Sequence, residues 1–132
     1  MKNFRTAACF GINMLLISLP GIDIKLVRKN GGQFLIRFEI KTFEGALSYF
    51  SSQYYLNRAG NDWSDVQNTK MEDRLIMGEI KFHCSESVMD FINFTISNHL
   101  HMQLIDEENS KQLYDRAVAA VNRAEIVADG RH

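Results

Sequence analysis

Histidine side chains offer the first chemistry that this sequence could perform, because His99 and His101 lie two residues apart and would point the same way on a strand. His83, on a neighbouring predicted strand, would add a third nitrogen, and three imidazoles with one open position suit a catalytic zinc ion. No carboxylate lies at a metal-binding spacing around them. We favour a second interpretation, in which His99 ends a helix, where a partly positive ring suits the dipole, and His101 is an outward strand residue. The sequence predicts no metal and no cofactor.

Acidic and nucleophilic residues form no recognisable catalytic pattern. The acidic pair at 72–73 and the acidic triplet at 106–108 lie beside predicted element starts, so we interpret both as solvated turns or helix caps. Cys84 follows His83, but adjacent strand residues face opposite sides and form no dyad. No G-x-S-x-G, phosphate-binding glycine loop, H-E-x-x-H or dinucleotide-binding motif occurs. The sequence therefore assigns no catalytic residue.

Length and composition predict one domain over residues 1–132, since 132 residues with 45% hydrophobic content form a single core. The 15 basic and 16 acidic residues give a formal charge of −1 without a run of Lys or Arg, which disfavours a nucleic-acid partner. Cys9 and Cys84 lie far apart without a CxxC pattern, so we expect free, buried thiols and a cytoplasmic protein.

The N-terminus has two interpretations. Lys2 and Arg5 precede an apolar segment, residues 7–19, which has the outline of a secretory signal peptide and is too short for a membrane span. Asn13 interrupts this segment, and no A-x-A cleavage site follows it. We therefore favour a buried strand or helix within the domain, with the signal-like N-terminus as the alternative.

The strongest structural pattern predicts a β-hairpin over residues 22–41, because two alternating runs flank Asn30-Gly31-Gly32. The even-numbered apolar residues face the core, and pairing even with even requires a three-residue loop at 30–32. The predicted opposed pairs are Ile22 with Ile40, Ile24 with Phe38, and Leu26 with Ile36.

The outward face of this hairpin is the first surface that could bind a partner. Like charges oppose one another there and unlike charges lie on the diagonals, a checkerboard formed by Asp23, Lys25, Arg37 and Glu39. The same register sets Val27 opposite Leu35, with both outward near the tip. An apolar spot rimmed by charge suits protein binding.

A first helix is expected after Thr42, which can cap it. Apolar residues recur along this helix at helical spacing, at Phe43, Leu47, Phe50 and Tyr54. With Phe50 and Tyr54 facing the core, Tyr49 and Tyr55 lie toward the flanks. Residues 61–73 form a long connection or a ragged strand that contains Trp63. Tyr55 and Trp63 together offer a second binding surface, because tyrosine and tryptophan are enriched at binding hot spots.

The remaining elements complete an α+β fold. We predict a strand at 75–84, a helix from about 85 to 99, a short strand at 100–105 and a terminal helix at about 110–128. That order is typical of a split β-α-β sandwich of the ferredoxin-like kind, with a mostly antiparallel sheet and helices on one face. Its second strand would come from residues 63–69, where the pattern is poor, so a simpler α+β sheet remains open.

Two functions are compatible with this sequence. We favour a small non-enzymatic protein-binding module, such as an inhibitor, an immunity-type or a regulatory protein, whose partner is another protein or a further copy of the chain. The alternative is a small-molecule-binding protein or a small oligomeric enzyme with a pocket near Trp63 or at a subunit contact. The expected binding residues are Lys25, Val27, Leu35, Arg37, Tyr55 and Trp63.

Overall fold

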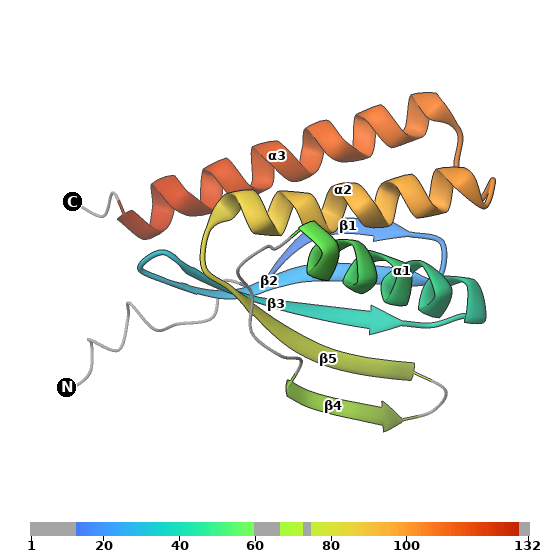
Figure 1. Cartoon of the computed structure of the whole chain (residues 1–132). Coiled ribbons are helices and arrows are strands. Elements are labelled where there is room, and N and C mark those ends of the chain that lie inside the picture. Colours follow the sequence, from blue (N-terminus) through green and yellow to red (C-terminus); the bar gives the residue numbers. More distant parts are fainter. Residues whose placement is uncertain (1–12, 60–66, 73–74, 130–132) are drawn as a thin grey trace.

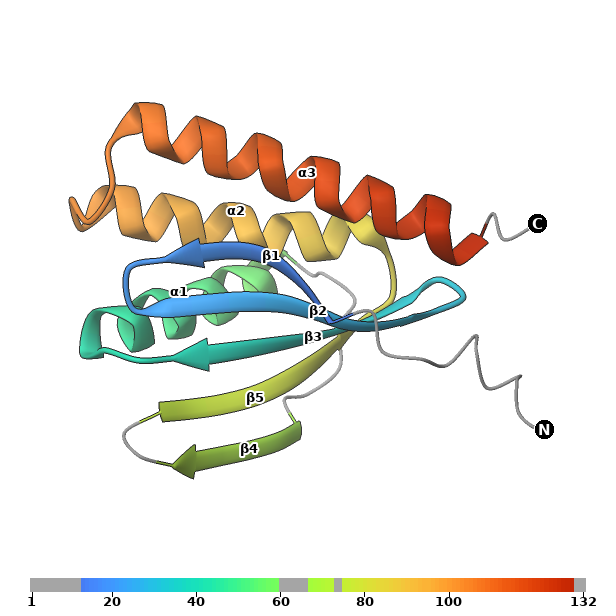
Figure 2. The ribbon, with the colours of Figure 1, turned by 180° about the vertical axis from the view of Figure 1, so that it is seen from behind.

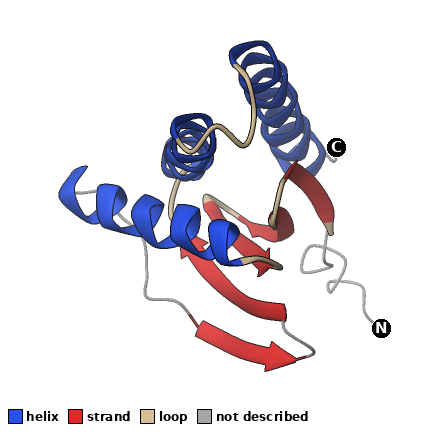
Figure 3. Ribbon diagram, turned by 90° about the vertical axis from the view of Figure 1, so that its right-hand side faces the viewer, coloured by secondary structure: helices blue, strands red, loops and turns tan. Residues whose placement is uncertain are grey.

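A five-stranded antiparallel sheet is covered on one face by three helices (Figure 1). The computed structural model describes residues 13–59, 67–72 and 75–129. The strands are β1 (Met14–Leu19), β2 (Ile22–Asn30), β3 (Gln33–Ile40), β4 (Gln67–Glu72) and β5 (Leu75–Phe82). The helices are α1 (Phe43–Ala59), α2 (Ser85–His101) and α3 (Glu107–Asp129). Figures 2 and 3 show all three helices on the same side of the sheet, which confirms the predicted α+β class.

The sheet order β1-β2-β3-β5-β4 contains the expected split β-α-β unit, because β5 lies between β3 and β4 and is antiparallel to both. The strand predicted at 100–105 is wrong, and β2 occupies the place beside β3 instead. The cause is local. Helix α2 continues to His101 and ends in a Schellman motif, in which Gln103 has a φ of 62° and the Leu104 N–H donates to the His99 carbonyl at 2.9 Å.

The predicted register of the β2–β3 hairpin is confirmed at Ile22–Ile40, Ile24–Phe38 and Leu26–Ile36. The predicted loop length is wrong, because Asn30 pairs with Gln33 and leaves a two-residue turn. Gly31 opens that turn with a φ of 63°, as a type II′ turn requires. A bulge at Val27 absorbs the extra residue, so Leu35 lies opposite Arg28 and not opposite Val27.

The apolar segment predicted at 7–19 contains strand β1, whose residues 14–19 pair antiparallel with β2. The remainder of that segment, residues 7–12, lies outside the described residues. Among the described helices, none is both long and apolar enough to cross a membrane.

Helix capping places α1 and α3 close to their predicted positions. The Thr42 hydroxyl accepts a hydrogen bond from the Gly45 N–H at 3.0 Å, which confirms the predicted cap of α1. The Asp106 carboxylate accepts from the Asn109 N–H at 2.8 Å, so α3 begins at Glu107, three residues before the predicted start. The acidic triplet at 106–108 is therefore a helix start, as the sequence indicated.

Helix α1 is seated with the opposite face inward from the one expected. Its buried residues are Gly45, Ser48, Tyr49, Ser52 and Leu56. The stripe expected in the core, Phe43, Leu47, Phe50 and Tyr54, is exposed. The buried face of α1 therefore combines small or polar residues at positions 45, 48 and 52 with the larger Tyr49 and Leu56.

A buried polar seam joins α1 to α2. Ser52 Oγ lies 2.8 Å from Thr95 Oγ1, and Ser48 Oγ lies 2.8 Å from His99 Nδ1. The Asn98 amide donates to the Ser48 carbonyl at 3.0 Å. These hydrogen bonds offset the free-energy cost of burying polar side chains on both helices. They also fix how the two helices pack.

The turn between β1 and β2 docks beneath the start of α1. Gly21 has a φ of 84°, and its carbonyl accepts a hydrogen bond from the Lys41 N–H at 2.7 Å. Gly45 approaches the Gly21 backbone so closely that a β-carbon at Gly45 would overlap the Gly21 carbonyl. His99 Nε2 lies 2.7 Å from the Pro20 carbonyl on the same turn. Backbone contact and one imidazole thus attach this turn to both helices.

Tyr49 is buried against the sheet, where its ring stacks on Phe38 with a centroid distance of 4.1 Å. Its hydroxyl is buried and has no hydrogen-bond partner among the described residues. Burial raises the pKa of this phenol far above its usual range.

Replacing Tyr49 by phenylalanine is therefore expected to raise the free energy of unfolding by about 1 kcal/mol, because the buried, unpartnered hydroxyl is removed while the ring stays. Denaturant unfolding monitored by circular dichroism measures the change. Tyr114→Phe, at a half-exposed ring of α3, is the control and should leave stability unchanged. A less stable Tyr49→Phe protein would show that the hydroxyl has a stabilising partner.

Candidate functional site

The outer face of α1 carries an exposed apolar stripe, which we define as Phe43, Leu47, Phe50 and Tyr54. Their exposed fractions are 73%, 45%, 58% and 55%, in that order. Single exposed apolar residues are ordinary on protein surfaces, whereas a contiguous set of large ones usually marks an interaction site. This stripe is the principal candidate site of the molecule.

The helical spacing of the stripe predicts a core position for it, and this prediction is wrong. A helical repeat of large apolar residues indicates one face of a helix, and the usual inference turns that face inward. The opposing signal was present in Gly45, Ser48 and Ser52, which share the other face at the same helical spacing. Small residues allow close helix approach, and the hydroxyls meet Thr95 and His99 of α2.

Tyr55 lies beside the stripe, as the sequence placed it on a flank of the helix. Its ring centroid is 5.6 Å from that of Tyr54 and 5.5 Å from that of Phe94 on α2. Almost half of its surface is exposed. Trp63, the other member of the predicted aromatic surface, lies outside the described residues.

The outward face of the sheet carries charges that are paired with one another. Lys25 binds Glu39 at 3.1 Å, the one diagonal of the checkerboard that is confirmed. The other expected diagonal does not form, because Arg37 binds Glu79 of β5 at 3.0 Å. The expected apolar spot also changes, since Leu35 is 7% exposed and Val27 is only half-buried.

Asp23, on the same face, accepts two side-chain hydrogen bonds. Lys41 donates to its carboxylate at 2.8 Å, and the Ser18 hydroxyl donates at 2.6 Å. Partial burial alone would raise the pKa of Asp23, but these two hydrogen bonds and the Lys41 charge outweigh it and hold the pKa below its usual value. Three ion pairs therefore lie on this face, namely Lys25–Glu39, Arg37–Glu79 and Lys41–Asp23.

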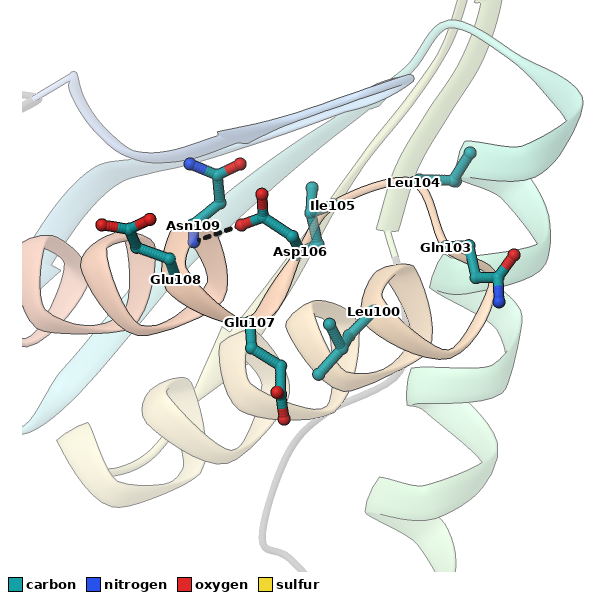
Figure 4. A pocket seen from close by; sticks show the side chains of 8 residues that line it. All are labelled: Leu100, Gln103, Leu104, Ile105, Asp106, Glu107, Glu108 and Asn109. Carbon is teal, nitrogen blue, oxygen red and sulfur yellow. Dashed lines mark hydrogen bonds between the residues drawn. The ribbon is translucent and has the colours of Figure 1, made fainter.

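Two surface hollows have no residue of α1 in their lining. The first, about 810 Å³, lies at the α2–α3 turn and is lined by residues 100 and 103–109. Figure 4 shows the Asp106 carboxylate turned onto the backbone of Asn109. The second, about 670 Å³, lies between the start of α2 and the middle of α3, with the free Cys84 and Tyr114 in its lining. In the first hollow, Asp106 is occupied as a helix cap.

The chain matches no protein-family model, no curated protein and no solved structure. Its functional assignment therefore depends on the chemistry of its own surfaces.

The favoured interpretation of the histidines is confirmed for the helix end at His99 and is wrong for the strand at His101. His99 is in the last turn of α2, as favoured, but it is fully buried and bonded to Pro20 and Ser48. His101 is exposed, but on a helix and not on a strand. Within residues 13–59, 67–72 and 75–129, no group of three or more His, Cys, Asp or Glu side chains could hold a metal ion.

Proposed function

We propose that this chain is a small non-enzymatic protein-binding module, of an inhibitor, immunity or regulatory kind, that docks its partner on the apolar stripe of α1. The observation that carries the proposal is the seating of α1, which buries Ser48 and Ser52 and leaves the four residues of the stripe exposed. Burying the stripe against a partner would remove this apolar surface from water, which is the main driving force for association.

The charge pattern of α1 supports the same surface. From residue 45 to residue 57 the helix contains no charged side chain, and Glu44 and Arg58 are its only charges. The centres of protein interfaces are depleted in charge and enriched in aromatic residues. Tyr55 is a natural rim residue of this site.

The hairpin surface predicted from Lys25, Val27, Leu35 and Arg37 is the less favourable docking site. Lys25 and Arg37 already have acidic partners, and a binding protein would have to compete with those ion pairs. We retain Trp63 as a candidate contact residue. The proposal includes a cytoplasmic location, which the two widely spaced cysteines support because disulfide-bonded domains are typical of secreted proteins.

Phe50→Glu tests this proposal. The tagged protein is expected to lose its partner in capture from host cells, by about tenfold or more, because a charge would be buried in an apolar contact. Ile126→Glu is the matched control, since Ile126 is a large apolar residue on α3 with 69% exposure. Quantitative mass spectrometry of the captured proteins measures the change, and thermal unfolding verifies that both variants are folded. Equal capture by wild type and Phe50→Glu would refute the α1 docking site.

A further inference from the structure

The outer face of α1 identifies its own partner class, and we propose that it binds a second copy of this chain in an antiparallel, two-fold symmetric helix pair. The inference rests on the proposed docking site and names what occupies it. Its basis is the symmetry of the spacing between the exposed residues.

The stripe has the same spacing in both directions. Its residues are separated by four, three and four positions, so the series is unchanged when the helix is reversed. A two-fold axis perpendicular to α1, passing between Leu47 and Phe50, therefore sets Phe43 against Tyr54 of the partner subunit. The same axis sets Leu47 against Phe50 of the partner subunit. An isologous interface requires this self-complementarity.

The intervals of four and three are also those of a helix-pairing seam. Apolar residues alternating at such intervals form the contact line between two packed helices, in which each side chain inserts between residues of the facing helix. Antiparallel packing further sets the positive N-terminal end of each helix dipole beside the negative C-terminal end of the other. In this arrangement every residue of the stripe therefore has a contact on the stripe of the second copy.

Charge does not oppose this self-association. Two-fold symmetry brings the same residues of both copies together near the axis, so a charged residue there would face its own copy. The residues nearest the axis are Leu47 and Phe50, and the charges of α1 lie at its two ends, at positions 44 and 58. No like-charge contact arises at the centre.

The exposed area is appropriate for a modest dimer interface. With roughly 200 Å² for a fully exposed aromatic side chain, the stripe exposes about 450 Å² per molecule. Two copies would bury about 900 Å² from these residues alone, and flanking residues such as Ser51 and Gln53 bring the total toward the ~1,200 Å² of small specific interfaces. The position of α1 at one border of the helical layer, with α2 and α3 on its other side, leaves this face accessible (Figure 3).

Sedimentation equilibrium on the full chain tests the proposal with Phe43→Glu and Tyr54→Lys, the two ends of the stripe. Wild type is expected at twice the 15.2 kDa chain mass, and each variant alone should raise the dimer Kd by about 30-fold or more. An equimolar mixture should form a heterodimer with a Kd within about threefold of wild type, because the antiparallel pair brings the introduced carboxylate of one variant to the introduced ammonium group of the other. In a parallel pair these two positions would be about 16 Å apart and would not compensate.

The remaining outcomes overturn the inference. A wild-type chain that stays at 15.2 kDa at about 100 µM, a concentration above the Kd of standard specific interfaces, excludes the second copy as partner. A dimer that both variants leave intact excludes this surface, and a mixture that does not recover excludes the antiparallel pairing. Ile126→Glu should dimerise like wild type. A monomeric wild type whose capture of another protein is still lost in Phe50→Glu would refute only the second copy, and the proposed function would stand.

Discussion

Replacing His99 by alanine is expected to lower the free energy of unfolding by about 3 kcal/mol and the melting temperature by about 10 °C. The imidazole is fully buried and bonded at both nitrogens, to the Pro20 carbonyl at 2.7 Å and to the Ser48 hydroxyl at 2.8 Å. A carbonyl only accepts, so Nε2 donates to Pro20, while Nδ1 also lies 3.1 Å from the Thr95 carbonyl. Alanine would leave a cavity and remove the bonding partner of both groups.

His101→Ala is the matched control, because His101 lies two residues further along the same helix and is exposed. Its stability should change by less than about 0.5 kcal/mol. Ser48→Ala combined with His99→Ala completes a double-mutant cycle, in which the two losses should fall short of additivity by about 1 kcal/mol. Chemical denaturation gives all four values. Similar losses for His99→Ala and His101→Ala would contradict the role of the buried ring.

Gly45→Ala is expected to have the second large effect on the free energy of unfolding. It should destabilise the protein, although helix propensity alone predicts stabilisation. Alanine in place of glycine normally stabilises a helix by about 1 kcal/mol. At position 45 the added β-carbon would overlap the Gly21 carbonyl, which is backbone and cannot rotate away. We expect a net loss of about 2 kcal/mol, since α1 or the β1–β2 turn must move.

Ser51→Ala supplies the control for this effect, because Ser51 is an exposed residue of the same helix and should gain a few tenths of a kcal/mol from propensity alone. Thermal unfolding of both variants against wild type separates the two contributions. A Gly45→Ala protein as stable as wild type would show that α1 and the β1–β2 turn are not in close contact.

The facing of the β2 and β3 side chains was predictable because a period of two leaves little choice. In β2 and β3, Ile24 and Phe38 could face only the same side, and the core contains both. The sequence did not determine whether the extra residue of the hairpin lies in the turn or in a bulge of β2. A three-residue loop and a two-residue turn with a bulge at Val27 satisfy the same register, and the difference alters only the tip.

The candidate site was less predictable because it depends on contacts between distant segments. The apolar repeat of α1 does not specify which face is buried. The answer depends on two partners in α2, Thr95 and His99, which follow Ser52 and Ser48 by 43 and 51 residues. The β1–β2 turn likewise selects glycine at position 45 only once the helix is packed on it. A single sequence contains these residues but not their pairing.

The hydrogen bond between His99 and Pro20 joins residues that are 79 positions apart. The strands β1, β2 and β3 are consecutive, so their pairing closes only short loops, whereas this contact closes the long stretch of chain from β2 to the end of α2. We therefore expect β1, β2 and β3 to pair early in folding and the imidazole bond to form in its last steps. Its stabilisation should then act mainly by slowing unfolding, so His99 would govern the lifetime of the native state more than the rate at which that state is reached.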